Sequence, residues 1–178
     1  MWPRSARRAA SSATRSSKSA TTERRPQEDR VLLQRTETVL AGLWAGLLLG
    51  IAAIAAPSAF AALDGAREQA GQVVRLIFAA EARASLVFAI VLFVIERRLA
   101  EQRAQSGQGS RISAELLLPL GALFCVVLGY FALQPLMEEA RTGAGKYSFG
   151  ALHATSTVFY GIKTLLVLVL AWRASGKR

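Results

Sequence analysis

Four long apolar blocks constrain the fold of this chain more than any other feature of its sequence. They cover residues 38–63, 73–95, 114–134 and 149–172, with short polar connections between them. A soluble fold is built from amphipathic elements with a polar face, whereas these blocks are apolar all round. Each block is long enough to cross a hydrocarbon core about 30 Å thick, which takes about 20 helical residues. Lipid offers no hydrogen-bond partner to the backbone, so each block must be a helix. The sequence therefore predicts an all-α polytopic membrane protein, a bundle of four transmembrane helices.

The distribution of Lys and Arg predicts the orientation of these helices. Nine basic residues precede the first block, four lie between the second and third blocks, and three follow the last block, which places sixteen on one side. The other two connections together hold three, which are Arg67, Arg141 and Lys146. Basic flanks stay on the cytoplasmic side. We therefore expect both termini in the cytoplasm, and an Arg-rich composition without Asn favours a bacterial inner membrane.

The first 35 residues differ in composition from the rest of the chain. They are rich in Ser, Thr and Arg, and such a segment cannot bury enough apolar surface to fold alone. We predict a disordered basic cytoplasmic tail over 1–35, a transmembrane domain over 36–174 and a short cytoplasmic tail over 175–178. Two alternatives for the tail are a native translation start near Val31 and a mitochondrial transit peptide, which would place the protein in a mitochondrial membrane.

Composition and motifs exclude several classes of function. The chain holds one Cys and one His, too few ligands for a structural zinc site. The net charge of +10 comes mainly from the tail and from the flanks of the apolar blocks, so we expect no nucleic-acid partner. No phosphate-binding loop, dinucleotide fingerprint, nucleophile elbow or zinc-protease motif is present. We expect no catalytic residue, no metal and no cofactor, and the lipid bilayer is the predicted partner, with a homo-oligomer or another membrane protein as a further one.

Small residues repeat every four positions in the first and third blocks, and each of these two blocks also contains a proline. Close backbone approach through small residues holds membrane helices together. The spacing therefore predicts helix-packing faces, and Cys125, in the same register, is expected to be a small packing residue. The third block is predicted to end before Pro135, and Pro57 and Pro119 are expected to shape their helices. The predicted packing glycines are Gly42, Gly46 and Gly50 in the first block, and Gly121 and Gly129 in the third.

Ionisable residues inside the blocks are costly in lipid and mark candidate sites. Arg83 lies about 18 Å and Glu81 about 21 Å from the cytoplasmic boundary at Ile95, and Lys163 lies about 14 Å from Trp172. Their similar depth predicts a buried pair between Glu81 and Lys163. A polar stripe on the fourth block, broadened by Thr157 and Thr164, completes a candidate site for a small polar substrate or a proton path. Its alternative role is to fix helix register. The candidate site residues are Glu81, Arg83, His153, Ser156, Tyr160 and Lys163.

Several short stretches, spread over three of the four apolar blocks, together carry a family resemblance. They are Trp44-Ala45-Gly46, the stretch 57–60, Leu63-Asp64, Ala70-Gly71, Phe78 and the stretch 149–156 with Leu152-His153. On these residues the chain resembles a bacterial membrane-protein family, domain-of-unknown-function family 4149, related to the transmembrane-protein-205 group. The resemblance covers about 36–174, and the long basic tail of this chain departs from the short N-terminus usual in that family. The resemblance implies a four-helix membrane domain and no established reaction.

Three functional hypotheses follow. The first is a non-enzymatic membrane protein that serves as a small transport, binding or accessory module. The second is a haem- or quinone-linked redox protein in which His153 is an axial ligand, since imidazole suits iron. The third is a structural subunit of a larger membrane complex.

Overall fold

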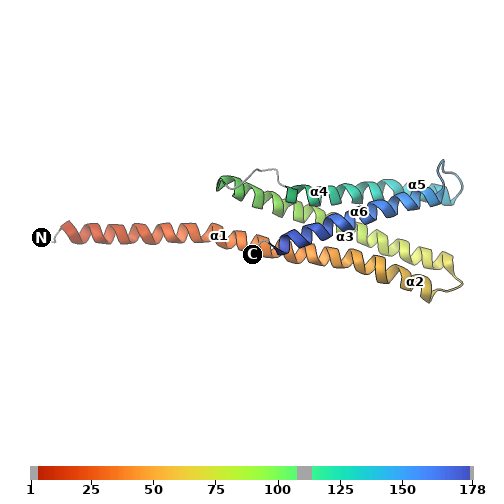
Figure 1. The fold of residues 1–178 in the computed structure, drawn as a ribbon, viewed down its shortest axis with the longest axis horizontal. Helices are drawn as coiled ribbons and strands as arrows, with labels where there is room; N and C mark the ends of the chain where they lie inside the picture. The colour runs from red at the N-terminus through yellow and green to blue at the C-terminus, as the bar shows by residue number, and fades with distance from the viewer. Residues whose placement is uncertain (1–3, 108–113, 177–178) are drawn as a thin grey trace.

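The computed structural model describes the backbone of residues 4–107 and 114–176, and the side chains of that part from residue 27 onward. Within these ranges the chain is helical and contains no strand (Figure 1). Four helical stretches are long and apolar enough to cross a membrane, as predicted. They span Gln27–Ala62, Arg67–Gln105, Glu115–Arg141 and Phe149–Ser175.

Two of the four spans are interrupted by a π-helical turn. The first span consists of α1 (Arg4–Gly50), η1 (Ile51–Ala55) and α2 (Ala56–Ala62). The second is the single helix α3 (Arg67–Gln105). The third consists of α4 (Ala114–Val126), η2 (Val127–Ala132) and α5 (Leu133–Arg141), and the fourth is α6 (Phe149–Ser175).

A proline follows each π-helical turn. Pro57 comes shortly after η1, and Pro135 shortly after η2. Proline lacks the backbone N–H that an α-helix needs, and a π-turn, with its wider hydrogen-bond spacing, accommodates that loss without ending the helix. The third span therefore continues through Pro135 to Arg141, and the predicted helix end before this proline is wrong. Pro119 lies inside α4, fully buried.

The N-terminal segment is part of the first helix from Arg4 onward, and the disorder predicted for residues 1–35 stays a prediction. This first part of α1 extends well beyond the other helices (Figure 1). The segment is rich in Ala and Arg, both strong helix formers, and it continues an existing helix, so no new nucleus is needed.

The four spans form a closed ring in which each helix packs on two others. Helix α3 packs against α1 and α4, and α6 packs against the same two, so α3 and α6 lie across the ring from each other. The core between them is built from Trp44, Leu48, Leu92 and Leu170. Trp44 also stacks on Phe88, with ring centroids 6.0 Å apart.

Large apolar side chains cover the outside of the ring, as lipid contact requires. Exposed apolar residues occur on every span, and Trp172 near the end of α6 is 82% exposed. This distribution inverts that of a soluble protein, which rarely exposes such wide apolar surface. The outer residues include Leu43, Leu76, Phe124 and Leu165.

The predicted packing glycines fall into two groups. A Cβ on Gly121 would come 3.2 Å from Leu166, and one on Gly129 would come 2.5 Å from the Cβ of Phe159, so both lie at the contact with α6. A Cβ on Gly42, Gly46 or Gly50 would meet nothing within 4 Å. These three therefore do not form the expected contact face within the chain.

The neighbours of the first-block glycines explain this difference. Trp44 and Leu48, with Ala41 and Ala45, turn toward the core and are buried. Gly42 follows Ala41, Gly46 follows Ala45 and Gly50 precedes the buried Ile51. Adjacent residues point about 100° apart around a helix. The large side chains take the core, and the glycines are left facing outward.

Candidate intramembrane polar site

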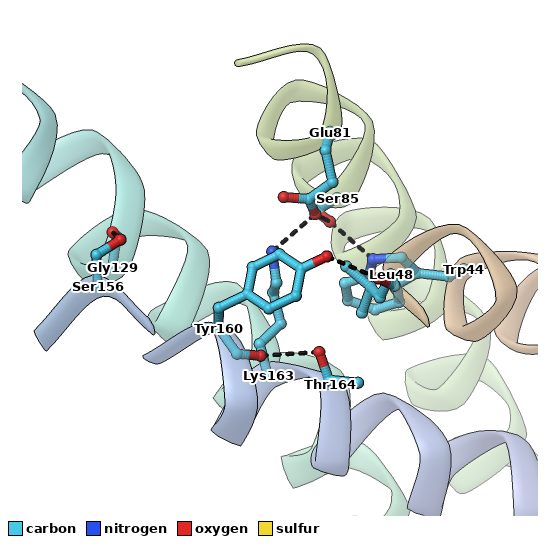
Figure 2. Close-up of polar contacts among 9 residues, drawn as sticks. All are labelled: Trp44, Leu48, Glu81, Ser85, Gly129, Ser156, Tyr160, Lys163 and Thr164. Carbon is cyan, nitrogen blue, oxygen red and sulfur yellow. Dashed lines mark hydrogen bonds and ion pairs between the residues drawn. The ribbon is translucent and has the colours of Figure 1, made fainter. Parts of the chain in front are cut away.

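A buried ion pair occupies the interior of the ring at membrane depth. The Nζ of Lys163 on α6 donates a hydrogen bond to Oε1 of Glu81 on α3 at 2.7 Å (Figure 2). The side chains are 5% and 2% exposed, respectively. This is the pair expected from the similar depth of the two residues. Because α3 and α6 lie across the ring, the pair bridges the bundle interior.

Two residues extend the pair toward α1. The hydroxyl of Ser85, one turn after Glu81 on α3, donates to the same Oε1 of Glu81. Ser85 in turn accepts a hydrogen bond from Nε1 of Trp44 at 2.8 Å. The indole N–H can only donate, so it occupies a lone pair of the hydroxyl and leaves the hydroxyl proton directed at the carboxylate. Three helices thus contribute to one continuous chain of polar contacts.

Tyr160 lines the same interior from α6. Its hydroxyl donates to the backbone carbonyl of Leu48 on α1 at 2.9 Å, and its ring lies edge-on to Phe78, with centroids 5.3 Å apart. The Nζ of Lys163 sits 4.5 Å from the centroid of the Tyr160 ring, within the range of a cation–π contact. The aromatic face therefore covers part of the ammonium that Glu81 also contacts.

Ser156 joins α6 to the π-turn of the third span. Its hydroxyl donates to the carbonyl of Gly129 in η2 at 2.8 Å (Figure 2). A π-helical turn and the prolines near it leave carbonyls without a helical partner, and such carbonyls accept from side chains. The same holds for Leu48, just before η1, which accepts from Tyr160. Both π-turns thus present an acceptor to α6.

The other residues of the predicted stripe lie elsewhere. His153 is exposed near the start of α6 and stacks on Phe149, with centroids 5.7 Å apart. Arg83 is exposed on the outer face of α3, on the far side from Glu81. Thr157 and Thr164 donate to the carbonyls of His153 and Tyr160 on their own helix, at 2.9 and 2.8 Å. The structure therefore brings Glu81, Lys163, Tyr160 and Ser156 to the interior, and it leaves Arg83 and His153 outside.

Trp44 and Ser85 are site residues that sequence reasoning missed. Ser85 follows Glu81 by four positions, which places both on one face of a helix, and this spacing could have identified it. Trp44 carries no comparable signal, because its role depends on how α1 packs against α3. Among the described residues, no group of His, Cys, Asp and Glu is placed to hold a metal ion.

The chemistry open to this arrangement is binding and proton exchange. One carboxylate, one ammonium and one hydroxyl meet in a space shielded from lipid, and the two charges cancel. Removing either partner alone would leave a buried charge uncompensated, which costs about 3–5 kcal/mol. The ion pair therefore separates most easily when a proton neutralises Glu81 or when a charged solute replaces one of the two partners.

Comparison with known proteins places the chain in a family without a known activity. No curated protein and no solved structure matches it. The family described as "Domain of unknown function (DUF4149)" matches residues 39–146, which include Trp44, Glu81 and Ser85 but not α6 with Lys163. The predicted relation to the transmembrane-protein-205 group stays a prediction. The match covers more than half of the sequence, and the chain is thus a four-span membrane protein that belongs to the DUF4149 family.

Proposed function

We propose that the protein is a small binding or transport module of the membrane, whose site is the Glu81–Lys163 pair and whose solute carries a carboxylate or a similar anionic group. The supporting observation is that Lys163 and Ser85 already bind one carboxylate, that of Glu81, in a place almost free of solvent. A solute carboxylate offers the same oxygen atoms. Ionisable groups at membrane depth are retained for such roles.

The exchange conserves charge. A proton that binds Glu81 makes this residue neutral and releases Lys163, whose ammonium then accepts the solute anion. The site holds one positive and one negative charge before and after the exchange, so no net charge is left at membrane depth. Trp44 holds Ser85 in place during the exchange, since its N–H occupies the hydroxyl oxygen. A proton and an anion are therefore taken up together.

Entry to the site is proposed at the end of the bundle away from the chain termini. There α2 and the start of α3 diverge from α5 and the start of α6 (Figure 1). Arg75 on α3 and Glu138 on α5 join the two arms at 3.1 Å, with side chains 36% and 52% exposed. Such exposed pairs contribute about 0–1 kcal/mol. This contact would open at little cost.

The membrane proposed for this function is the bacterial inner membrane, with both termini in the cytoplasm. The distribution of basic residues supports this orientation. The diverging arms would then face the periplasm. A solute from outside the cell would reach Lys163 past Arg75.

Uptake into proteoliposomes tests the proposal. Two labelled monocarboxylates, lactate and pyruvate, serve as probes, with the pH lower outside than inside. We expect saturable uptake that rises with the pH gradient in the wild type and is lost in Lys163→Met. The Glu81→Gln variant carries a permanently neutral partner, so we expect it to bind the probe without dependence on pH.

A double variant separates a solute site from a device that fixes helix register. Replacement of a buried ion pair by similar uncharged side chains is often neutral or stabilising. We expect Glu81→Gln/Lys163→Met to fold as stably as the wild type and to lose uptake, whereas Arg97→Gln, the matched control at an exposed position away from the site and its entry, keeps it. Absence of saturable uptake of both probes by the wild type, or equal uptake by the double variant, would refute the proposal.

A second candidate function is that of a structural subunit. It is favoured by the outward face of Gly42, Gly46 and Gly50, where an added Cβ meets nothing. Another membrane helix could approach α1 closely there. Under this proposal Gly46→Leu abolishes a larger assembly in native gels while the monomer stays folded, and an unchanged assembly contradicts it.

A further inference from the structure

A cavity opens between α1 and α3 at the end of the bundle that carries both termini. Its volume is about 260 Å³, and Arg30 and Gln34 of α1 and Leu99 and Arg103 of α3 line it. The two α1 residues precede the first apolar block, and the two α3 residues follow the second. The cavity therefore lies at the polar boundary of the membrane, the level at which lipid headgroups sit.

The lining combines cationic donors with one apolar side chain. Arg30 and Gln34 are one helical turn apart, as are Leu99 and Arg103, so each helix presents two side chains one above the other. Arg30 makes no hydrogen bond or ion pair to any residue in the described part of the chain. An arginine fork with open donors matches the geometry of a phosphate or carboxylate group.

Three acidic side chains near this end, those of Glu37, Glu96 and Glu115, are already engaged. Arg103 contacts Glu96 at 3.4 Å and Glu115 at 3.8 Å, and Glu115 also accepts from Arg173 at 2.7 Å. Glu37, buried on α1, has a partner as well. Arg103 thus already contacts two carboxylates, and its Nε donates to the carbonyl of Leu99 at 3.3 Å. Because the two carboxylate contacts are long for ion pairs, the guanidinium keeps capacity for a further anion. The cavity thus presents two guanidinium groups to a ligand. One of them, that of Arg30, has no partner among the described residues.

We propose that this cavity binds the phosphate of an anionic phospholipid. The acyl chains would leave the cavity over exposed apolar surface of α3 at greater depth, such as Val91, which lies about 80° around the helix from Leu99. Basic pockets between membrane helices at this level are suited to anionic headgroups. A lipid fits better than a free anion because the cavity lies at the level of the headgroups, with exposed apolar surface of α3 at the next level of depth.

Lipid-dependent stability tests the assignment. The purified full-length protein is reconstituted in phosphatidylcholine vesicles with and without phosphatidylglycerol, and bound lipid is counted by native mass spectrometry. We expect phosphatidylglycerol to bind and to raise the unfolding temperature. Arg30→Gln should weaken this binding about fivefold, the effect of one basic group near an anionic surface. Arg30 is the residue to change, since loss of Arg103 would also disturb Glu96.

Two controls make the assignment refutable. Arg97→Gln removes an equal charge that is exposed and paired with Glu101 at 3.1 Å, outside the cavity, and should leave phosphatidylglycerol binding unchanged. Equal losses in both variants would show diffuse surface attraction and overturn the site. Inorganic phosphate added to the phosphatidylcholine vesicles should not stabilise the protein, and equal stabilisation by phosphate would replace the lipid with a free anion. Equal unfolding temperatures in the two vesicle compositions would also overturn the proposed lipid site.

Discussion

The contact between η2 and α6 predicts a large effect from adding a single methyl group. A Cβ on Gly129 would lie 2.5 Å from the Cβ and 3.2 Å from the Cγ of Phe159. Carbon atoms reach their optimal separation at about 3.5–4.0 Å, so the two helices must part by about 1 Å. The added Cβ at position 129 and the Cβ of Phe159 are both bonded to the backbone, so no rotamer change can relieve their overlap. Ser156 would then lose its 2.8 Å bond to the carbonyl of Gly129.

The expected cost of Gly129→Ala combines these two terms. Overpacking costs about 1–3 kcal/mol, and the lost hydrogen bond adds about 1 kcal/mol. We expect the free energy of unfolding to fall by about 2–4 kcal/mol. It can be measured by titrating the detergent-solubilised protein with dodecyl sulfate and following helicity by circular dichroism.

Two other glycines provide matched controls. In Gly121→Ala the nearest atom is the flexible Cδ1 of Leu166 at 3.2 Å, so a small loss is expected. In Gly46→Ala the new methyl group meets nothing within 4 Å, and the stability should not fall. If Gly129→Ala were as stable as Gly46→Ala, the close approach of η2 and α6 would be refuted.

Three further predictions concern the core, the ends and the orientation. Trp44→Phe removes the indole donor to Ser85 and should lower the free energy of unfolding by about 1–3 kcal/mol, whereas Trp172→Phe, at an exposed position, should not change it; equal effects in dodecyl sulfate titrations would contradict the buried role of Trp44. Glu115→Gln weakens contacts to Arg173 and Arg103 in which the Glu115 side chain is only 14% exposed, and should cost about 1–3 kcal/mol in the same titration; a loss no larger than that of an exposed pair would contradict these contacts. Alkaline phosphatase, active only in the periplasm, should be inactive when fused after residue 178 and active when inserted in the connection at 142–148; the opposite pattern would reverse the orientation.

The four spans were predictable because length and apolarity are properties of each segment alone. The Glu81–Lys163 contact was predictable for a related reason, since depth along a helix follows from counting residues. The face that each helix turns inward depends on its neighbours instead. The outward face of Gly42, Gly46 and Gly50 shows this, because the same spacing suits packing inside the chain or contact outside it. Here the side chain of Trp44 fills the core, and the glycines of the first span are therefore left facing outward.

The π-turns were not predictable from the prolines alone. A proline in an apolar segment can end a helix, kink it or lie within a widened turn, and the local sequence fits all three. Which of the three outcomes occurs depends on which groups donate to the carbonyls that lose their helical partner near the proline. Here α6 supplies donors to Leu48 and Gly129, through Tyr160 and Ser156. The continued third span is therefore tied to its contact with the next helix, α6, and the first span to a contact with the same helix much later in the chain.

The position of the ion pair in the ring argues for a role beyond holding helices together. Polar contacts that stabilise helix association in lipid join helices that already touch. The bonds from Trp44 to Ser85, from Tyr160 to Leu48 and from Ser156 to Gly129 are of this kind, since each connects adjacent spans. Among the interhelical hydrogen bonds of the described residues, only that from Lys163 to Glu81 crosses between the two helices that lie opposite each other. Neutral contacts between neighbours would fix the register at lower desolvation cost than two charges placed at the centre of the bundle. A charged pair in that position is better explained by the solute and proton exchange proposed for it.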